Sequence, residues 1–300
     1  MRSTPDLRGH TVLALHAHPD DEAIFTGLTL RRLADAGART VLVVATAGEL
    51  GESRLPLRRG ETIARRRITE LERSAALLGV SRLVLLGRRD SGLPGWASGA
   101  HPRALAGADP RRLARRVARV AEAEGAETLI YDDEHGIYGH PDHLSAHRIG
   151  DAAAALTGAG TYQITVDREH LHVSAPDRHL IHGAAEAAGV HFGRTSSEIT
   201  LAVRGNTEQV ASKHAAITAH ASQVDPRHLP VDEFAGAYGI EWYRHDGPPG
   251  VLHLLDTAPP STLASATPAL ATLAPGTPAL ATLAPGTPDL ATPALSISAV

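Results

Sequence analysis

The sequence predicts an α/β protein with a Rossmann-like, mostly parallel sheet and helices on both faces, followed by a disordered tail rich in proline and alanine. Two observations predict the sheet. Over the first 150 residues, short apolar runs alternate with segments in which apolar residues recur every three or four positions. The runs are apolar throughout rather than at alternate positions, which is typical of parallel strands covered on both faces.

The alternation begins with the apolar run 12–15, which predicts a buried strand. Residues 23–36 have helical periodicity, and Gly37 ends that helix. The run 40–45 is rich in β-branched residues and predicts the second strand. After a glycine-rich loop, apolar residues at helical spacing predict a helix over 64–78.

The next elements follow in the same order. Residues 82–86 predict a third strand, and Asp109 with Pro110 has the cap and first-turn residues of a third helix. Residues 128–131 predict a fourth strand, and 144–156 a helix after it. Beyond these the pattern is less regular, with strands expected at 162–166 and 198–203 and a helix at 207–221.

Composition limits the classes of function. The 300 residues are 43% hydrophobic, enough for a globular core, and the formal net charge is -4, which gives no reason to expect a nucleic-acid partner. The chain has no cysteine, so a bound metal must use His, Asp, Glu or water. No apolar run is long enough to cross a membrane, and we expect a cytoplasmic protein. The sequence does not specify an oligomeric state.

The C-terminal segment has a different composition. The decapeptide at 267–276 repeats identically at 277–286, and a degenerate copy follows. Frequent proline opposes both helix and sheet, and the repeats are low in charge and lack aromatic residues. We therefore expect a single domain over residues 1–257 and a disordered tail over 258–300 without a catalytic role. A segment that docks a partner is the alternative.

Two tetrapeptides carry the chemistry. The sequence His18-Pro19-Asp20-Asp21 follows the first strand, and His140-Pro141-Asp142-His143 follows the fourth, 122 positions later. Parallel sheets bind ligands outside the carboxyl ends of their strands, so both motifs are expected at one edge. Imidazoles and carboxylates together suit a catalytic zinc site, and a spare carboxylate can activate water. Spacing alone leaves open which of Asp20 and Asp21 binds the metal.

These motifs resemble those of the PIG-L (LmbE-like) family of zinc-dependent N-deacetylases. The resemblance rests on 17–22 and 139–143, which are specific, and on weaker patches in the same order at 46–49, 67–71, 86–92 and 213–223. The family includes N-acetylglucosaminyl-inositol deacetylases and mycothiol S-conjugate amidases. The resemblance therefore implies a metal-dependent hydrolase that acts on a small N-acylated sugar.

The resemblance also implies roles for individual residues. His18, Asp21 and His143 would bind Zn²⁺, although two imidazoles and a carboxylate also suit Fe²⁺. Asp20 would be the general base. His140 would stabilise the oxyanion or protonate the leaving amine, and Asp142 would orient His140 and raise its pKa. Tyr138 would assist at the substrate carbonyl.

Several alternatives remain open at the level of sequence. Arg67 and Asp90 could contact substrate hydroxyls, or could equally form a salt bridge or a cap. His147 could be a ligand on spacing alone, since it lies one turn after His143, but a structural role is favoured.

An amidase for a mycothiol S-conjugate or a secondary metabolite is the nearest alternative function. A nucleotide-binding or scaffold protein is the alternative from another class, but the turn after the first strand lacks the glycines that pyrophosphate binding needs.

Overall fold

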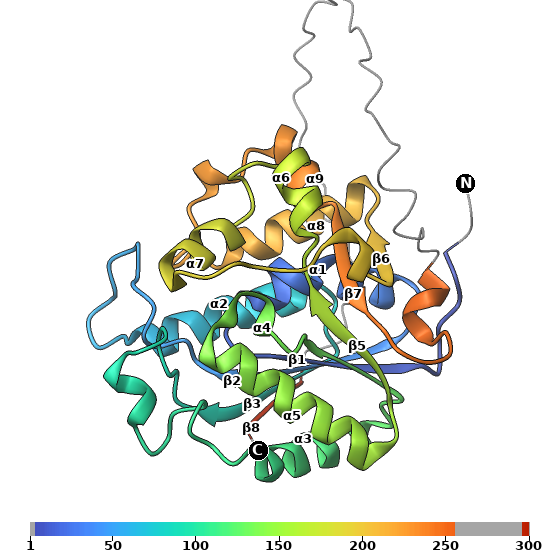
Figure 1. Ribbon diagram of the computed structural model, residues 1–300, viewed down its shortest axis with the longest axis horizontal. Helices are drawn as coiled ribbons and strands as arrows, with labels where there is room; N and C mark the ends of the chain where they lie inside the picture. Colours follow the sequence, from blue (N-terminus) through green and yellow to red (C-terminus); the bar gives the residue numbers. More distant parts are fainter. Residues whose placement is uncertain (1–3, 256–295, 300) are drawn as a thin grey trace, which may run out of the picture.

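The computed structural model describes residues 4–255 and 296–299. Its strands form one eight-stranded sheet in the order β6-β7-β5-β4-β1-β2-β3-β8 (Figure 1). The strands are β1 Thr11–His16, β2 Arg39–Thr46, β3 Arg82–Arg88, β4 Thr128–Asp132, β5 Gly160–Thr165, β6 Leu201–Arg204, β7 Ile240–Arg244 and β8 Ser296–Ala299. Five neighbouring pairs are parallel: β5 with β4, β4 with β1, β1 with β2, β2 with β3 and β3 with β8. Strand β7 is antiparallel to both of its neighbours, β5 and β6.

Helices cover both faces of this sheet, as the alternating pattern predicts. The longer helices are α1 Asp21–Asp35, α2 Ile63–Leu77, α3 Pro110–Glu124, α5 Pro141–Thr157 and α8 Thr207–Ala219. The shorter ones are α4 Gly136–Gly139, α6 Arg168–Ser174, α7 Ile181–Ala188 and α9 Val231–Tyr238, with 3-10 turns at Ala97–Ala100, Ser196–Glu198, Pro226–His228 and Val251–Leu255. Figure 1 shows α3 and α5 on one face and α1, α2 and α8 on the other. No described helix is long and apolar enough to span a bilayer.

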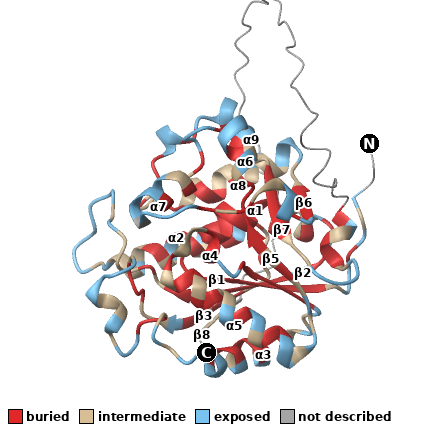
Figure 2. Cartoon of the chain, viewed as in Figure 1, coloured by how far each residue is buried: buried red, intermediate tan, exposed pale blue. Residues whose placement is uncertain are grey.

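Two apolar cores lie against the two faces. Successive residues of β1 alternate between them: Val12 and Ala14 pack in the core under α1, α2 and α8, while Leu13 and Leu15 pack in the core under α3 and α5. Both sets are fully or almost fully buried, and Figure 2 shows the central strands as the buried middle of the molecule. Burial on both faces explains why the strands are continuously apolar.

A buried ion pair joins α1, α8 and β7. Lys213 is 1% exposed, and its Nζ donates to Glu241 Oε1 at 2.7 Å. Glu241 also accepts from the backbone N–H groups of Leu28 and Thr29 at 2.8 and 2.9 Å. A Cβ at Gly27 would lie 3.1 Å from the Lys213 side chain, so a glycine lets α1 approach α8 closely. Burial lowers the pKa of Lys213, but Glu241 opposes this shift.

The fold confirms the predicted class and the elements of the first 157 residues, with boundaries shifted by a few residues. The strand expected at 198–203 begins later, at Leu201, because a 3-10 turn occupies Ser196–Glu198. The sequence analysis missed β7 and the short helices α4, α6, α7 and α9. These elements are four to eight residues long, too short for periodicity to be distinctive.

A short part of the segment predicted as a disordered tail is a strand. Residues Ser296–Ala299 form β8, which pairs in parallel with β3 from Arg82 to Leu85. This short segment lacks proline and alternates polar with apolar residues, unlike the repeats before it. The repeats themselves lie outside the described residues.

We predict that a chain ending at residue 257 will fold and keep its activity, because β8 lies at the opposite side of β3 from β1 and β4. Loss of this edge pairing should lower the melting temperature by only a few degrees. Circular dichroism melts and turnover of the full and shortened chains measure both effects. An unfolded or inactive shortened chain would contradict the proposed domain boundary.

Candidate active site

The two His-Pro-Asp motifs meet because β1 and β4 are adjacent and parallel. Val12 pairs with Thr128 and Ala14 with Ile130, so both strands end at the same edge of the sheet. The first motif forms the turn from β1 into α1. The second follows β4 through the single turn α4 and opens α5. The structure thus brings together two motifs that begin 122 positions apart in the sequence.

The turn after β1 holds Asp20 in an unusual backbone conformation. Its φ is 109°, in the left-handed region, and its side chain does not cap α1 although it occupies the cap position. The Asp20 N–H donates to Glu22 Oε2 at 2.9 Å, which stabilises this turn. Glu22 is fully buried, and its other oxygen lies 2.7 Å from His220 Nε2. Left-handed backbone at a non-glycine residue costs free energy and is often found at functional sites.

The second motif is held by the start of α5. His140 is the N-cap, and its Nδ1 accepts a hydrogen bond from the Asp142 N–H at 3.1 Å. Pro141 lies in the first turn, as expected from its fixed φ. This arrangement puts His143 at the inner face of α5, where it is completely buried. Because Nδ1 of His140 accepts, a neutral His140 carries its proton on Nε2.

Three side chains form a group that fits a metal ion. One ligand atom each of His18, Asp21 and His143 lies within 4.8 Å of the others, and all three residues are buried. Asp21 Oδ2 is 3.6 Å from His18 Nδ1 and 3.5 Å from His143 Nε2. These are the three residues that the family resemblance implies as ligands. His147 instead lies with its Nδ1 3.0 Å from the Asp132 carbonyl oxygen, which favours the structural role.

Two further carboxylates lie behind the imidazoles. The far nitrogen of His143 is 2.9 Å from Asp132 Oδ2, and that of His18 is 3.2 Å from Asp142 Oδ2. Metal-binding histidines commonly use the second ring nitrogen in this way, which fixes the ring orientation and increases ligand basicity. The donor set therefore fits a divalent cation held by Asp21 and the near nitrogens of the two histidines.

The charges of the group also favour a cation. Burial opposes protonation of His18, yet the carboxylates of Asp142 and Asp21 raise its pKa well above the usual value. The pKa of His143 is likewise raised against burial by Asp21 and Asp132. Burial alone would raise the pKa of Asp21, but the two imidazoles lower it strongly. Buried carboxylates thus outnumber the imidazoles they face, which is the electrostatic setting of a cation site.

The carboxylate of Asp142 lies between His18 and the loop at Ser91. It is 3.2 Å from His18 Nε2 and accepts from the Ser91 N–H at 3.0 Å, while the Asp142 N–H donates to the His140 ring. Burial and the neighbouring His18 and His143 lower the pKa of His140 to about 2, and the carboxylates of Asp142 and Asp21 oppose this shift. The direction of the Asp142 effect is therefore the one that the resemblance implies, but burial outweighs it.

Asp20 faces Arg67. Arg67 Nη2 is 3.0 Å from Asp20 Oδ2, and Nη1 donates to the Gly48 carbonyl at 2.8 Å. The approach to Gly48 requires a glycine, since its φ is 60° and a Cβ there would lie 2.3 Å from the guanidinium. Burial raises the pKa of Asp20, whereas Arg67 opposes that shift. The salt-bridge alternative for Arg67 is therefore present in the structure.

A pocket of about 430 Å³ opens over this group. Its lining includes four residues of the two motifs: His18, Asp20, Asp21 and His140. It also includes the three candidate residues outside the motifs, which are Arg67, Asp90 and Tyr138. Asp90 accepts from the N–H groups of Gly92 and Leu50 at 2.8 and 3.3 Å, so its carboxylate also holds two loop segments, and it caps no described helix. The Tyr138 hydroxyl is 3.4 Å from His143 Nε2, and burial raises the pKa of Tyr138 well above its usual value.

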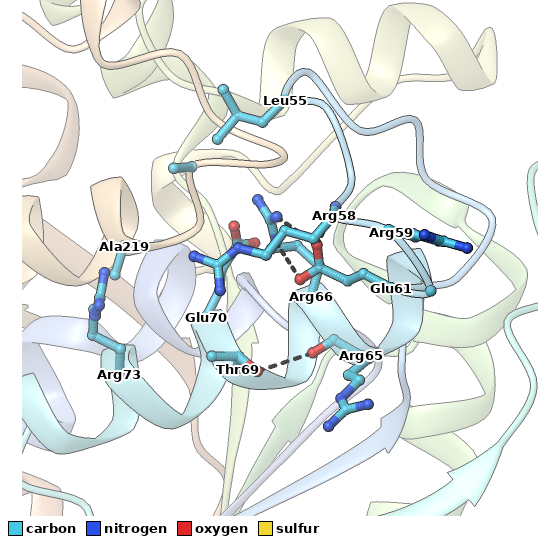
Figure 3. A pocket seen from close by; sticks show the side chains of 12 residues that line it. Leu55, Arg58, Arg59, Glu61, Arg65, Arg66, Thr69, Glu70, Arg73 and Ala219 are labelled. Atoms are coloured by element: carbon cyan, nitrogen blue, oxygen red, sulfur yellow. Dashed lines mark hydrogen bonds and ion pairs between the residues drawn. The ribbon is translucent and has the colours of Figure 1, made fainter.

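A larger hollow, about 560 Å³, lies along α2 and lacks this chemistry (Figure 3). Glu61 and Arg66 pair across it at 2.6 Å, and no histidine is among its lining residues. Its arginines are Arg58, Arg59, Arg65, Arg66 and Arg73. Imidazole ligands and a candidate base occur together only in the pocket over His18, as far as the described chain extends.

Sequence reasoning missed several residues that support the site. Asp132 had a usable signal, since it directly follows the apolar run of β4, where ligands of parallel sheets are expected. Glu22 and His220 lie 198 positions apart and carry no such signal. Ser91 was seen only as part of a weak patch, and its N–H bond to Asp142 depends on a loop that the sequence did not predict.

Comparison with known proteins agrees with this geometry. The family model described as PIG-L, GlcNAc-PI de-N-acetylase, matches residues 13–154, which include both motifs. A 1D-myo-inositol 2-acetamido-2-deoxy-alpha-D-glucopyranoside deacetylase of Kineococcus radiotolerans is 38% identical over 248 residues, covering 71% of this chain and 68% of that protein. The chain belongs to the PIG-L family. A deacetylase of the same name from Nakamurella multipartita is 36% identical over 247 residues, covering 75% and 82%.

Solved structures share the PIG-L fold at lower identity. The N,N'-diacetylchitobiose deacetylase of Pyrococcus horikoshii has a TM-score of 0.51 at 22% identity, covering 84% of this chain and 85% of its own. A conserved protein of Thermus thermophilus has a TM-score of 0.51 at 19% identity, covering 80% and 96%. Membership of the PIG-L family makes the protein a hydrolase, which favours the enzyme over the nucleotide-binding alternative.

We predict that Asp132→Asn will weaken metal binding about 10- to 100-fold, because the amide is a poorer partner for His143 than a carboxylate. Competition with a chelator measures the affinity. Asp151→Asn, an exposed residue of the same helix as His143, is the matched control and should bind metal normally. Unchanged affinity in Asp132→Asn would show that Asp132 does not support a ligand.

Proposed function

We propose that this protein hydrolyses the acetamide of an N-acetylglucosamine unit linked to a polyol such as inositol, releasing acetate and a free amine. The observation that carries the proposal is the group of His18, Asp21 and His143 at a pocket that His18, Asp21 and Asp20 line. The named activity of relatives at 32–38% identity supports the choice of substrate. The partner is thus a small molecule.

His18, Asp21 and His143 would hold the metal, for which we propose zinc. When bound, a divalent ion polarises the amide carbonyl and lowers the pKa of water. Ferrous iron would suit the same donors, and metal analysis of the purified protein separates the two. The carboxylates of Asp132 and Asp142 would keep the two imidazoles in the orientation that metal binding requires.

Asp20 is the general base of the proposed mechanism. It accepts the proton of the attacking water and passes it to the departing nitrogen, so one carboxyl group serves both half-reactions. Its side chain lines the pocket, does not cap α1, and is aligned by the Arg67 guanidinium at 3.0 Å. Burial raises its pKa toward the range of an effective base, although Arg67 limits the rise.

His140 stabilises the oxyanion of the tetrahedral intermediate. Its Nδ1 accepts from the Asp142 N–H and burial lowers its pKa, so the neutral ring carries its proton on Nε2 and can donate one hydrogen bond to the oxyanion. Of the two roles suggested by the resemblance, the oxyanion role therefore fits better. Tyr138, whose hydroxyl stays protonated, supplies a second donor near the same atom.

Asp90 and Arg67 are proposed to orient the sugar. Asp90 lines the pocket 3.8 Å from His18, where its carboxylate could accept from a hydroxyl in addition to its two backbone bonds. Arg67 is directed at Asp20 and would act on the substrate mainly through the position of that base. An amine-release assay against a panel of N-acetylated sugars, inositol glycosides and thiol-conjugate amides tests the substrate class. Release only from the conjugate amides would favour the amidase alternative.

We predict that Asp20→Asn will bind metal normally but lose about 10²- to 10⁴-fold in kcat, because the amide cannot accept the proton of water. Metal analysis and amine release on the same sample give the two readouts. Normal turnover in this variant would remove Asp20 as the base.

We predict that His140→Ala will lower kcat about 10²- to 10³-fold, the usual effect of deleting one oxyanion donor. Its metal content should stay near that of the parent protein, since His143 and His18 are intact. The opposite pattern, lost metal with a proportional loss of activity, would make His140 a ligand.

A further inference from the structure

One exposed aromatic side chain lies at the mouth of the catalytic pocket. The chain has two tryptophans: Trp242 is 2% exposed, whereas Trp96 is 50% exposed. Trp96 lines the same pocket as His18 and Asp20. Aromatic residues are only 3% of this sequence, and tryptophan is enriched at binding interfaces, where one end of the ring is apolar and the other is wet.

The indole is held by a tightly wound loop. The φ of Gly92 is 72°, and a Cβ at this position would lie 2.6 Å from Trp96 Cε3, so the ring packs directly on the glycine. The backbone N–H of Trp96 donates to the Leu93 carbonyl at 3.0 Å. Ser98 Oγ donates to the Ser91 carbonyl at 2.7 Å and closes the loop. A ring held in this way binds a ligand at a small entropic cost.

The same loop is bonded to the floor of the pocket. The Ser91 N–H donates to Asp142, which contacts His18, and the Gly92 N–H donates to Asp90 at 2.8 Å. The position of the indole is therefore set relative to the metal group and to the proposed sugar contact. This continuity distinguishes Trp96 from exposed apolar residues elsewhere, such as Leu57, which is 37% exposed and lines none of the pockets described above.

The lining of the pocket changes from floor to mouth. The floor carries His18, Asp21 and His140, all buried. Its other lining residues include an apolar set formed by Leu93 and Trp96 from the loop and by Leu180, Ile181 and Ala184 at the start of α7. A polar floor with apolar walls suits a ligand with a reactive amide at one end and a ring at the other.

The order of groups in the substrate decides what meets the indole. The acetyl methyl is one bond from the carbonyl carbon, so it must lie at the buried floor. Trp96 lines the same pocket but is half in solvent, so it faces the part of the substrate farther from the amide. We propose that Trp96 forms a stacking platform for the ring of the aglycone, meaning the group attached to the amino sugar. This subsite rests on the proposed deacetylase function and makes the substrate a glycoside with a ring aglycone.

The test compares two substrates in three variants. We expect Trp96→Ala to lower kcat/KM about tenfold for N-acetylglucosaminyl-inositol, the size of one lost aromatic contact, mainly through KM. Free N-acetylglucosamine, which lacks the second ring, should be affected less than twofold. Trp96→Phe should restore most of the loss, and Leu57→Ala should behave as the parent. An equal loss on both substrates, or none on either, would overturn the proposal.

Tryptophan fluorescence gives a second readout that does not need turnover. Because Trp242 is buried, Trp96 is the fluorophore that a ligand at the mouth can reach. Glucosaminyl-inositol, the amine product, should change the emission with saturation, whereas glucosamine should not, and Trp96→Phe should abolish the response. No response in the parent protein would overturn the subsite. If the parent protein releases amine from neither substrate, the proposed function fails, and this titration still tests Trp96.

Discussion

The parallel pairing of β1 with β4 is the constraint on which the site depends. It brings the carboxyl ends of two strands together although their motifs begin 122 positions apart. Each strand then delivers its motif into the start of a helix, α1 or α5, where the backbone fixes the direction of each side chain. A slip of one residue in this register would exchange the two faces of the strand and separate Asp21 from His143.

Around this edge, buried charges support one another in pairs. His18 faces Asp21 and Asp142, and His143 faces Asp21 and Asp132. Burying such groups is costly unless each has a partner of opposite charge or a hydrogen bond. The strained backbone of Asp20 is part of the same arrangement, because Glu22 accepts its N–H while its carboxylate lines the pocket and pairs with Arg67.

Much of this could be predicted from sequence, and the parts that could not share a physical cause. The strands could be predicted because burial on both faces makes 12–15 and 40–45 continuously apolar. The candidate metal-binding residues could be predicted because both motifs follow such strands. The direction of a side chain could not be predicted. Asp142 contacts His18, and Arg67 contacts Asp20, and the two residues of each pair lie 124 and 47 positions apart in the sequence. Trp96 gave no signal because its exposure depends on tertiary packing.

The buried Lys213–Glu241 pair has a consequence for the chemistry of the protein surface. Lys213 is the only lysine in the sequence and is 1% exposed, so the folded protein offers no lysine amine to an acylating reagent. An enzyme that liberates amines thus has no competing side-chain amine of its own in contact with solvent. Acylation of Lys213 would report that α8 has separated from β7, and so would measure local opening of this part of the fold.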